Sequence, residues 1–261
     1  MRKYVAIFRV QLLNSLAYPI NFLGRSLMVV LFLWIFFQLW RTVYAANGQT
    51  VINGLSLHDT LWYLMLAETL ELGRPRLERA VSAAVKDGAI AYLLNKPYDF
   101  LLYQLSIALG ESIPQTGLNA LIGGALVWVM VGAPPPVYGW PGTLLVFAGA
   151  WLLHFFVNAM IGLAAFVTEE VAPFTWIYQK LVFVLGGMLI PLDFYPAWLQ
   201  GIVHKLPFAA MMYAPARLFV QPTWAHFWQA IGMQSLWLII FGGVLWLAYR
   251  QGLQRLVING G

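Results

Sequence analysis

A few ionisable side chains stand inside long apolar runs of this sequence, where they could contact a cargo or carry a proton. Glu68 and Glu71 are three residues apart, so a helix would place both carboxylates on one face. In lipid each charge would cost on the order of 3 kcal/mol, so both should face protein or water. They could form a gate or contact a cationic cargo. Pairing with Arg74 or Arg25 at the membrane surface is the interpretation that we favour.

Polar residues also interrupt two later apolar runs. Glu111 and Asn119 fall in one of them, and polar positions at helical spacing are typical of a packed interior face. His154 stands beside two phenylalanines in the other, where it could carry a proton, although a hydrogen bond to a neighbouring helix is the more common role. These three residues, with Glu68 and Glu71, are the candidates for a translocation path or gate.

Known catalytic and metal-binding patterns are absent from the sequence. The dipeptide Gly-Lys does not occur, so there is no phosphate-binding loop of the common ATPase type. Neither His-Glu-x-x-His nor Gly-x-Ser-x-Gly is present, the four histidines are far apart in sequence, and there is no cysteine. We therefore predict no catalytic residue, no metal site and no cofactor in this chain.

The composition excludes an ordinary soluble protein. Of the 261 residues, 61% are hydrophobic and 10% are charged, whereas soluble domains have roughly 25% charged residues. The fifteen lysines and arginines are scattered and form no long basic run, so nucleic acid is not an expected partner. The apolar residues come in blocks close to the roughly 20 residues that a membrane helix needs.

These blocks predict an all-α, polytopic membrane protein that forms a single domain over residues 1–261. Residues 4–18 alternate polar and apolar positions as an interfacial helix does, and Pro19 separates them from the first span. The six predicted spans are 21–40, 57–72, 106–131, 143–167, 174–190 and 230–249.

Two connections between these blocks differ from the others. Residues 73–97 are the most charged part of the chain and are expected to lie in water. Residues 191–228 consist of short apolar pieces broken by prolines, which predicts a re-entrant or interfacial region between the fifth and sixth spans.

The basic residues indicate the orientation. Lysine and arginine near span ends stay on the cytoplasmic side, and six spans with a cytoplasmic amino terminus place twelve of the fifteen there. Both termini are then cytoplasmic. The chain as a whole is expected in the plasma (inner) membrane of the cell.

Two segments, taken with the six-span plan, resemble the permease subunits of type-two ABC exporters. The first lies within residues 74–97 and is similar to the cytoplasmic coupling segment of that family, with a charged residue and a glycine, then apolar residues, then a proline. The residues that carry this resemblance are Val85, Lys86, Asp87, Gly88, Leu93, Leu94, Asn95, Lys96 and Pro97.

The second segment resembles the outer re-entrant region that follows the fifth span in the same family. It has a glycine-rich approach, paired prolines, and a later Pro-Phe and Ala-Pro. Its residues are Gly186, Gly187, Pro191, Pro196, Pro207 and Pro215.

The resemblance implies a transport subunit without its own ATPase site. Separate ATP-binding subunits would carry ATP and Mg, and a second permease subunit, identical or paralogous, would complete a path for export of an amphiphilic or hydrophobic substrate. A secondary transporter or channel that works without ATP is an alternative. Such proteins often repeat their broken helices in both halves, whereas here the broken region occurs once. A structural protein without cargo is a second alternative.

Overall fold

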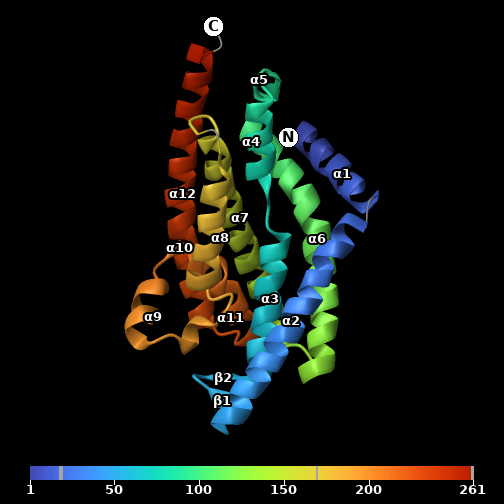
Figure 1. Ribbon diagram of the computed structural model, residues 1–261, viewed down its shortest axis with the longest axis vertical. Helices are drawn as coiled ribbons and strands as arrows, with labels where there is room; N and C mark the ends of the chain where they lie inside the picture. The colour runs from blue at the N-terminus through green and yellow to red at the C-terminus, as the bar shows by residue number, and fades with distance from the viewer. Residues whose placement is uncertain (18–19, 169, 260–261) are drawn as a thin grey trace.

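The computed structural model describes residues 1–17, 20–168 and 170–259, and these ranges are almost entirely helical (Figure 1). The helices that correspond to the predicted spans are α2 (Ile20–Asn47), α3 (Leu57–Gly73), α6 (Phe100–Val131), α7 (Trp140–Ala164), α8 (Ala172–Leu185) and α12 (Trp224–Asn259). The other helices are α1 (Arg2–Ala17), α4 (Leu77–Lys86), α5 (Ala89–Leu94), α9 (Ala197–Val203), α10 (Pro207–Met211) and α11 (Tyr213–Val220), with the 3-10 turns η1 (Val137–Gly139) and η2 (Leu192–Phe194).

Four described segments are long and apolar enough to cross a membrane. They are Ser26–Asn47, Phe100–Val131, Val137–Ala164 and Trp224–Gln251. An all-helical protein that crosses the bilayer several times is therefore confirmed. The count of six remains a prediction, since α3 has 17 residues and α8 has 14.

Local sequence explains where several helices begin and end. The Ser56 hydroxyl accepts from the Asp59 backbone N–H while the Asp59 carboxylate accepts from the Ser56 N–H, a capping box that starts α3. The Asp99 carboxylate accepts from the Leu102 N–H, so α6 begins at Phe100 rather than at 106 as predicted. Gly187, with φ of +78°, follows the last turn of α8, which ends at Leu185 instead of 190.

The helices of the first, fourth and sixth predicted spans also differ from the predicted limits, the sixth because α12 covers Trp224–Asn259 instead of 230–249. The first span was expected to end at residue 40, but α2 continues to Asn47. The fourth was expected over 143–167, whereas α7 begins at Trp140 and ends at Ala164. The described residues also contain a short β-hairpin. Its strands, β1 (Val51–Ile52) and β2 (Leu55–Ser56), have two residues each, and Val51 pairs with Ser56.

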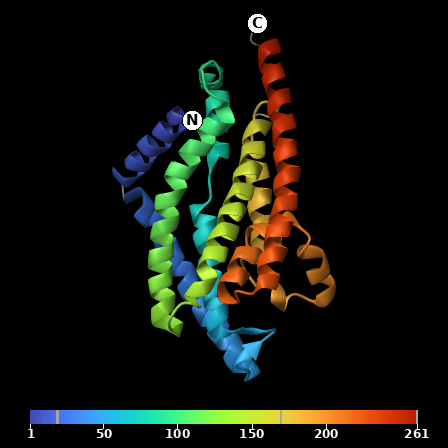
Figure 2. The ribbon, with the colours of Figure 1, turned by 180° about the vertical axis from the view of Figure 1, so that it is seen from behind.

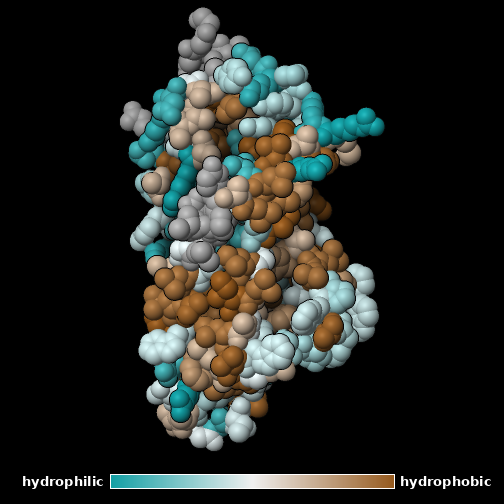
Figure 3. Space-filling model, turned by 90° about the vertical axis from the view of Figure 1, so that its right-hand side faces the viewer, coloured by the Kyte–Doolittle hydropathy of each residue, from teal (hydrophilic) through white to brown (hydrophobic). Residues whose placement is uncertain are grey.

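The long helices form one elongated bundle with α4 and α5 at one end and the hairpin at the other (Figures 1 and 2). Gly123 of α6 lies close to Val29 of α2 and Met65 of α3, so a small residue allows three helices to meet. The buried amide of Gln234 on α12 donates to the backbone carbonyls of Val146 and Ala210, at 2.8 and 3.0 Å, and ties α12 to α7 and α10. Figure 3 shows apolar side chains gathered over the middle of one face and hydrophilic ones towards the α5 end.

The amino-terminal segment is helical as predicted, up to Ala17, whereas Tyr18 and Pro19 lie outside the described residues. Helix α1 packs along α6. Gly110 allows this approach, since a Cβ there would lie 2.8 Å from that of Gln11. The Gln11 amide donates to the Glu111 carboxylate at 2.9 Å, and the Tyr4 hydroxyl accepts from the Asp99 N–H.

The charged stretch 73–97 does not lie wholly in water, which corrects the prediction. It folds into α4 and α5, and Arg74 and Glu78 are only 4% and 1% exposed. The reason is α4's close packing on α7. A Cβ at Gly162 of α7 would lie 3.1 Å from Val81, so the glycine lets α4 cover these charged side chains.

Candidate functional site

A buried polar network joins α3, α7 and α8 in the half of the bundle nearest α4. The Arg74 Nε donates to the Glu71 carboxylate at 2.7 Å, and one of its Nη atoms lies 3.4 Å from the Asn158 side-chain oxygen. Asn158 in turn donates to the carbonyls of Pro75 and His154. The favoured pairing of Glu71 with Arg74 is thus present, while the side chain of Arg25 lies outside the described residues.

His154 belongs to the same network and is fully buried. One ring nitrogen, Nδ1, lies 2.5 Å from the Tyr178 hydroxyl, which also lies 3.6 Å from the Met211 sulfur. The Arg74 guanidinium stands over the Tyr178 ring at 5.6 Å. The predicted hydrogen bond between His154 and a neighbouring helix is therefore present. Together Glu71, Arg74, His154, Asn158 and Tyr178 form what we call the Arg74 network.

Glu68 is buried without a partner of its own. Its side chain is 1% exposed, and neither carboxylate oxygen has a hydrogen-bond partner among the described residues. An isolated buried charge is costly. Among the candidate path residues, the Glu68 carboxyl therefore has the fewest hydrogen bonds to offset its burial.

The other two candidate path residues lie elsewhere. The Asn119 side-chain oxygen accepts from Ser26 of α2 and from Gln115 of α6, at 2.8 Å each. Glu111 is bonded to Gln11 of α1. These contacts fasten α6 to α2 and α1, so the structure gives Asn119 and Glu111 roles in packing.

Glu78 at the start of α4 faces the same region from outside the long helices. Burial raises the pKa of the Glu78 carboxyl above its ordinary value of 4.5, and the charges of Arg74, Arg79 and Arg76 oppose that rise. The Glu78 carboxyl is therefore near enough to Arg74 for the two charges to interact, which brings the first turn of α4 close to the network.

The predicted coupling residues lie at the α5 end of the molecule, on two helices joined by a tight turn. Val85 and Lys86 end α4, the Asp87 N–H donates to Ala83, and Gly88 turns the chain with φ of +72°. No described residue lies within 4 Å of a Cβ at Gly88, so its backbone conformation, not crowding, explains the glycine.

Contacts at both ends of this segment fix it to the bundle. The Lys86 ammonium pairs with the Glu170 carboxylate at 2.5 Å, whereas Glu169 lies outside the described residues. Leu93 and Leu94 of α5 pack against a cluster that includes Ile90 and Phe100. Asn95, Lys96 and Pro97 follow, and the Pro97 carbonyl accepts from the Lys3 ammonium of α1.

One side of the coupling segment is open. Tyr92 of α5 is 68% exposed, with the Lys96 ammonium 4.5 Å from the centre of its ring. Figure 1 shows α4 and α5 continuing beyond the start of α6 at the end that also carries the carboxy terminus. An aromatic side chain presented in this way is a common anchor for a protein partner.

The proline-rich residues 191–228 form the short pieces that their sequence predicts. Pro191 and Pro196 directly precede η2 and α9, Pro207 begins α10, and Pro215 lies in α11. The tight turn at Gly186 and Gly187 is held by the Tyr63 hydroxyl, which donates to the Gly187 carbonyl at 2.9 Å.

Sequence reasoning missed a second ionic cluster in this region. Arg217 of α11 faces Asp193 of η2, with Nε and Oδ1 3.4 Å apart, and the Tyr213 hydroxyl donates to the same carboxylate at 3.1 Å. The Arg217 Nε and the Asp193 Oδ2 have no hydrogen-bond partner among the described residues. The available signal was a single acidic residue in a mostly apolar stretch that also contains Lys205 and Arg217. We call Asp193, His204, Tyr213 and Arg217 the Arg217 cluster.

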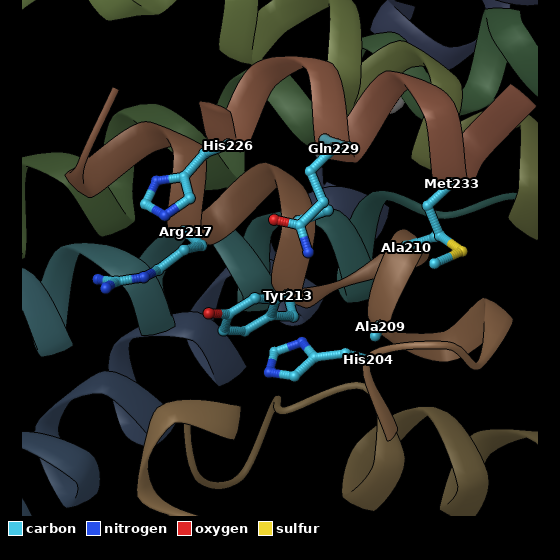
Figure 4. A pocket seen from close by; sticks show the side chains of 10 residues that line it. His204, Ala209, Ala210, Tyr213, Arg217, His226, Gln229 and Met233 are labelled. Carbon is cyan, nitrogen blue, oxygen red and sulfur yellow. The ribbon is translucent and has the colours of Figure 1, made fainter. Parts of the chain in front are cut away.

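A small cavity of about 40 Å³ adjoins this cluster (Figure 4). His204 and His226, which are far apart in sequence, both line it, with Tyr213, Arg217 and Gln229. The His204 ring stands edge-on to Tyr213 at 4.8 Å. Burial lowers the pKa of His204, and the Asp193 charge opposes this change.

Such a bundle of long apolar helices defines a polytopic membrane protein. The family model for ABC-2 family transporter proteins matches residues 26–260. The chain therefore belongs to the ABC-2 transporter family, as the resemblance of its two segments implied. No curated protein matches its sequence.

Proposed function

We propose that this chain is the permease subunit of an ATP-driven ABC exporter that moves an amphiphilic or hydrophobic substrate. Two permease subunits, identical or paralogous, would enclose the path, and separate ATP-binding subunits would supply ATP and Mg. The proposal depends on one observation: a chain of the ABC-2 family presents α4 and α5 beyond the bundle, with Tyr92 exposed. The low content of charge inside the long helices favours an apolar cargo.

Six spans remain the arrangement that we propose. Helix α3 of 17 residues is about 26 Å long and α8 of 14 is about 21 Å, from the 1.5 Å rise per residue. The hydrocarbon core is about 30 Å thick, so α3 nearly crosses it and α8 would need residues 186–190 to do so. With a cytoplasmic amino terminus, α4, α5 and both termini would face the cytoplasm of the plasma (inner) membrane.

In this arrangement the hairpin and the helices α9, α10 and α11 lie towards the outer face. Backbone broken at membrane depth is tolerated only where protein or a water-filled cavity surrounds it. The Arg217 cluster supplies polar partners of that kind, which supports a re-entrant region that enters from outside.

The Arg74 network offers a route by which the coupling segment could act on the path. Arg74 follows α3 directly and contacts α7, and α4 begins three residues later. A movement of α4 and α5 driven by closure of the ATP-binding subunits would therefore displace the side chains around Glu68, Glu71 and His154. Exchange of hydrogen-bond and ion-pair partners between two conformations is one way in which a ligand-driven change spreads through a protein.

Purification from native membranes tests the proposal. The tagged full-length chain should retain an ATP-binding subunit, and the complex in lipid nanodiscs should hydrolyse ATP. Tyr92→Ala should weaken this association and lower hydrolysis. The matched control is Tyr138→Ala, because Tyr138 is 76% exposed but lies next to the hairpin end, in η1.

Two results would overturn the proposal. One is equal loss of ATPase activity in both tyrosine variants, which would remove the assignment of the motor contact. The other is a chain that carries a cargo across liposome membranes by itself without ATP, which would favour the secondary transporter or channel.

A further inference from the structure

An apolar groove opens on the side of the bundle and is not explained by coupling or by the buried polar networks. Its floor is α3, with Trp62 and Met65, and its walls are α6, with Gly124, and α7, with Phe147. Phe219 of α11 closes one side. The groove has a volume of about 510 Å³, which is within the usual range for small-molecule sites.

The lining excludes an ionic occupant. None of the lining residues is charged, and the only hydroxyl groups are those of Thr69, Thr116 and Thr143. The Thr143 hydroxyl already donates to the Gly139 carbonyl at 3.0 Å, and that of Thr69 points to the Met65 sulfur at 3.5 Å. An occupant must therefore be apolar along most of its length.

The groove runs lengthwise along α6. It extends from Trp128 and Trp140, near the ends of their helices, to Thr116, and twelve residues of α6 correspond to about 18 Å. That is more than half of the roughly 30 Å hydrocarbon core. Because α6 and α7 make few contacts with each other, the groove is open between them over this distance.

The rim favours a flexible chain over a helix from a second copy. Leu121, Trp128 and Leu144 stand outward on either side and are 73%, 60% and 67% exposed. Helices in membranes associate through small residues that let their backbones approach closely. Bulky side chains on the rim would hold a second helix away from the floor, whereas an acyl chain can pass between them.

We propose that this groove binds an acyl chain of a bilayer phospholipid, lying between α6 and α7 on the surface of α3. The site would make the packing of α3, and so the position of Glu68 and Arg74 further along it, sensitive to the surrounding lipid. The proposal requires only that the helices lie in a bilayer and does not depend on ATP-driven export.

Photo-labelling in nanodiscs tests it, with a phospholipid that carries a diazirine on its acyl chain. Labelled peptides should concentrate on residues 62–69 and 116–128. Gly124→Leu should fill the groove and reduce this labelling several-fold. Gly124→Ala is the milder variant, because its Cβ would lie 3.8 Å from the Trp62 ring, an ordinary contact, and it should reduce labelling less.

The control variant is Gly232→Leu on α12, where a Cβ would meet nothing within 4 Å and the groove is untouched. It should leave the labelling of α3 and α6 unchanged. Labelling spread evenly over all the apolar helices, or unaltered by Gly124→Leu, would overturn the proposal. Since the natural chain has no cysteine, Gly124→Cys supplies a further check. A disulfide between two copies at this position would show a protein interface instead of a lipid site.

Discussion

The two buried ionic clusters of this molecule differ in how closely their ion pairs approach. In the Arg74 network the ion pair has a 2.7 Å hydrogen bond, and Asn158 connects Arg74 to two backbone carbonyls. In the Arg217 cluster the closest approach of the pair is 3.4 Å, and Arg217 and Asp193 retain unbonded atoms, as Glu71 and His154 do in the Arg74 network. A buried pair stabilises a fold only where additional hydrogen bonds complete it. The ion pair of the Arg74 network is thus held more closely than the ion pair of the Arg217 cluster.

The helices around the Arg74 network are also longer than those around the Arg217 cluster. The Arg74 network lies between long helices, where α4 is pressed against Gly162 of α7. The Arg217 cluster lies among η2, α10 and α11, whose boundaries are set by prolines and not by long ladders of hydrogen bonds. We infer that a change of conformation begins more easily at the second cluster.

The largest effect is expected from Arg74→Met. It would leave the half-buried Glu71 carboxylate and the Asn158 side-chain oxygen without Arg74, and removing one member of a buried pair costs about 3–5 kcal/mol. The melting temperature in detergent, followed by intrinsic fluorescence, should fall sharply. Arg41→Met is the control, because Arg41 is exposed on α2. A similar small change in both variants would contradict the importance of the network.

Removal of one charge from the Arg217 cluster should have a smaller effect. Arg217→Met would leave the Asp193 carboxylate with Tyr213 alone, and an unsatisfied buried group costs about 1–3 kcal/mol. The double variant Asp193→Leu with Arg217→Met should be no less stable than the single one, because a loosely bonded pair can be replaced by apolar residues. The distinction between the two clusters would fail if the double variant lost as much stability as Arg217→Met and Asp193→Leu lose when their separate losses are added.

Tyr178→Phe should have a still smaller effect. It removes the hydroxyl that joins His154 to the Met211 sulfur but keeps the ring beneath Arg74. Hydrogen bonds between membrane helices contribute about 0.6 kcal/mol on average. A double-mutant cycle with His154→Phe should give a coupling of that size. Strict additivity of the two changes would argue against the contact.

The elements were easier to predict than their interactions. Apolar blocks, capping residues and prolines are local signals, and they predicted α2, α3, α6, α7, α8 and α12 together with the broken region 191–228. The ends of these helices were less accurate, since caps such as Asp99 and turns such as Gly187 act one residue at a time.

The candidate site could be predicted only in part, because burial depends on which helices meet. Glu71 with Arg74 is an interaction within four residues, and it was expected. Asn158 with Arg74 spans 84 residues of sequence, and nothing local indicates it. The burial of Glu78 depends on Gly162, which reads in sequence as one small residue among many. The pairing of Asp193 with Arg217 was hidden for the same reason.

The smallest effect is expected at Glu78 and concerns pH. Because burial raises the pKa of its carboxyl, the folded protein holds this proton more tightly than the unfolded chain. The resulting stability is present below the ordinary pKa of the carboxyl and is lost as the pH rises through the raised value. Glu78→Gln should therefore leave the melting temperature almost unchanged at pH 5 but raise it slightly at pH 8. Glu170→Gln, at an exposed carboxylate paired with Lys86, should not reproduce this difference. Parallel pH profiles for the wild type and Glu78→Gln would contradict this expectation. They would mean that the charges of Arg74, Arg76 and Arg79 fully compensate the buried Glu78 carboxylate.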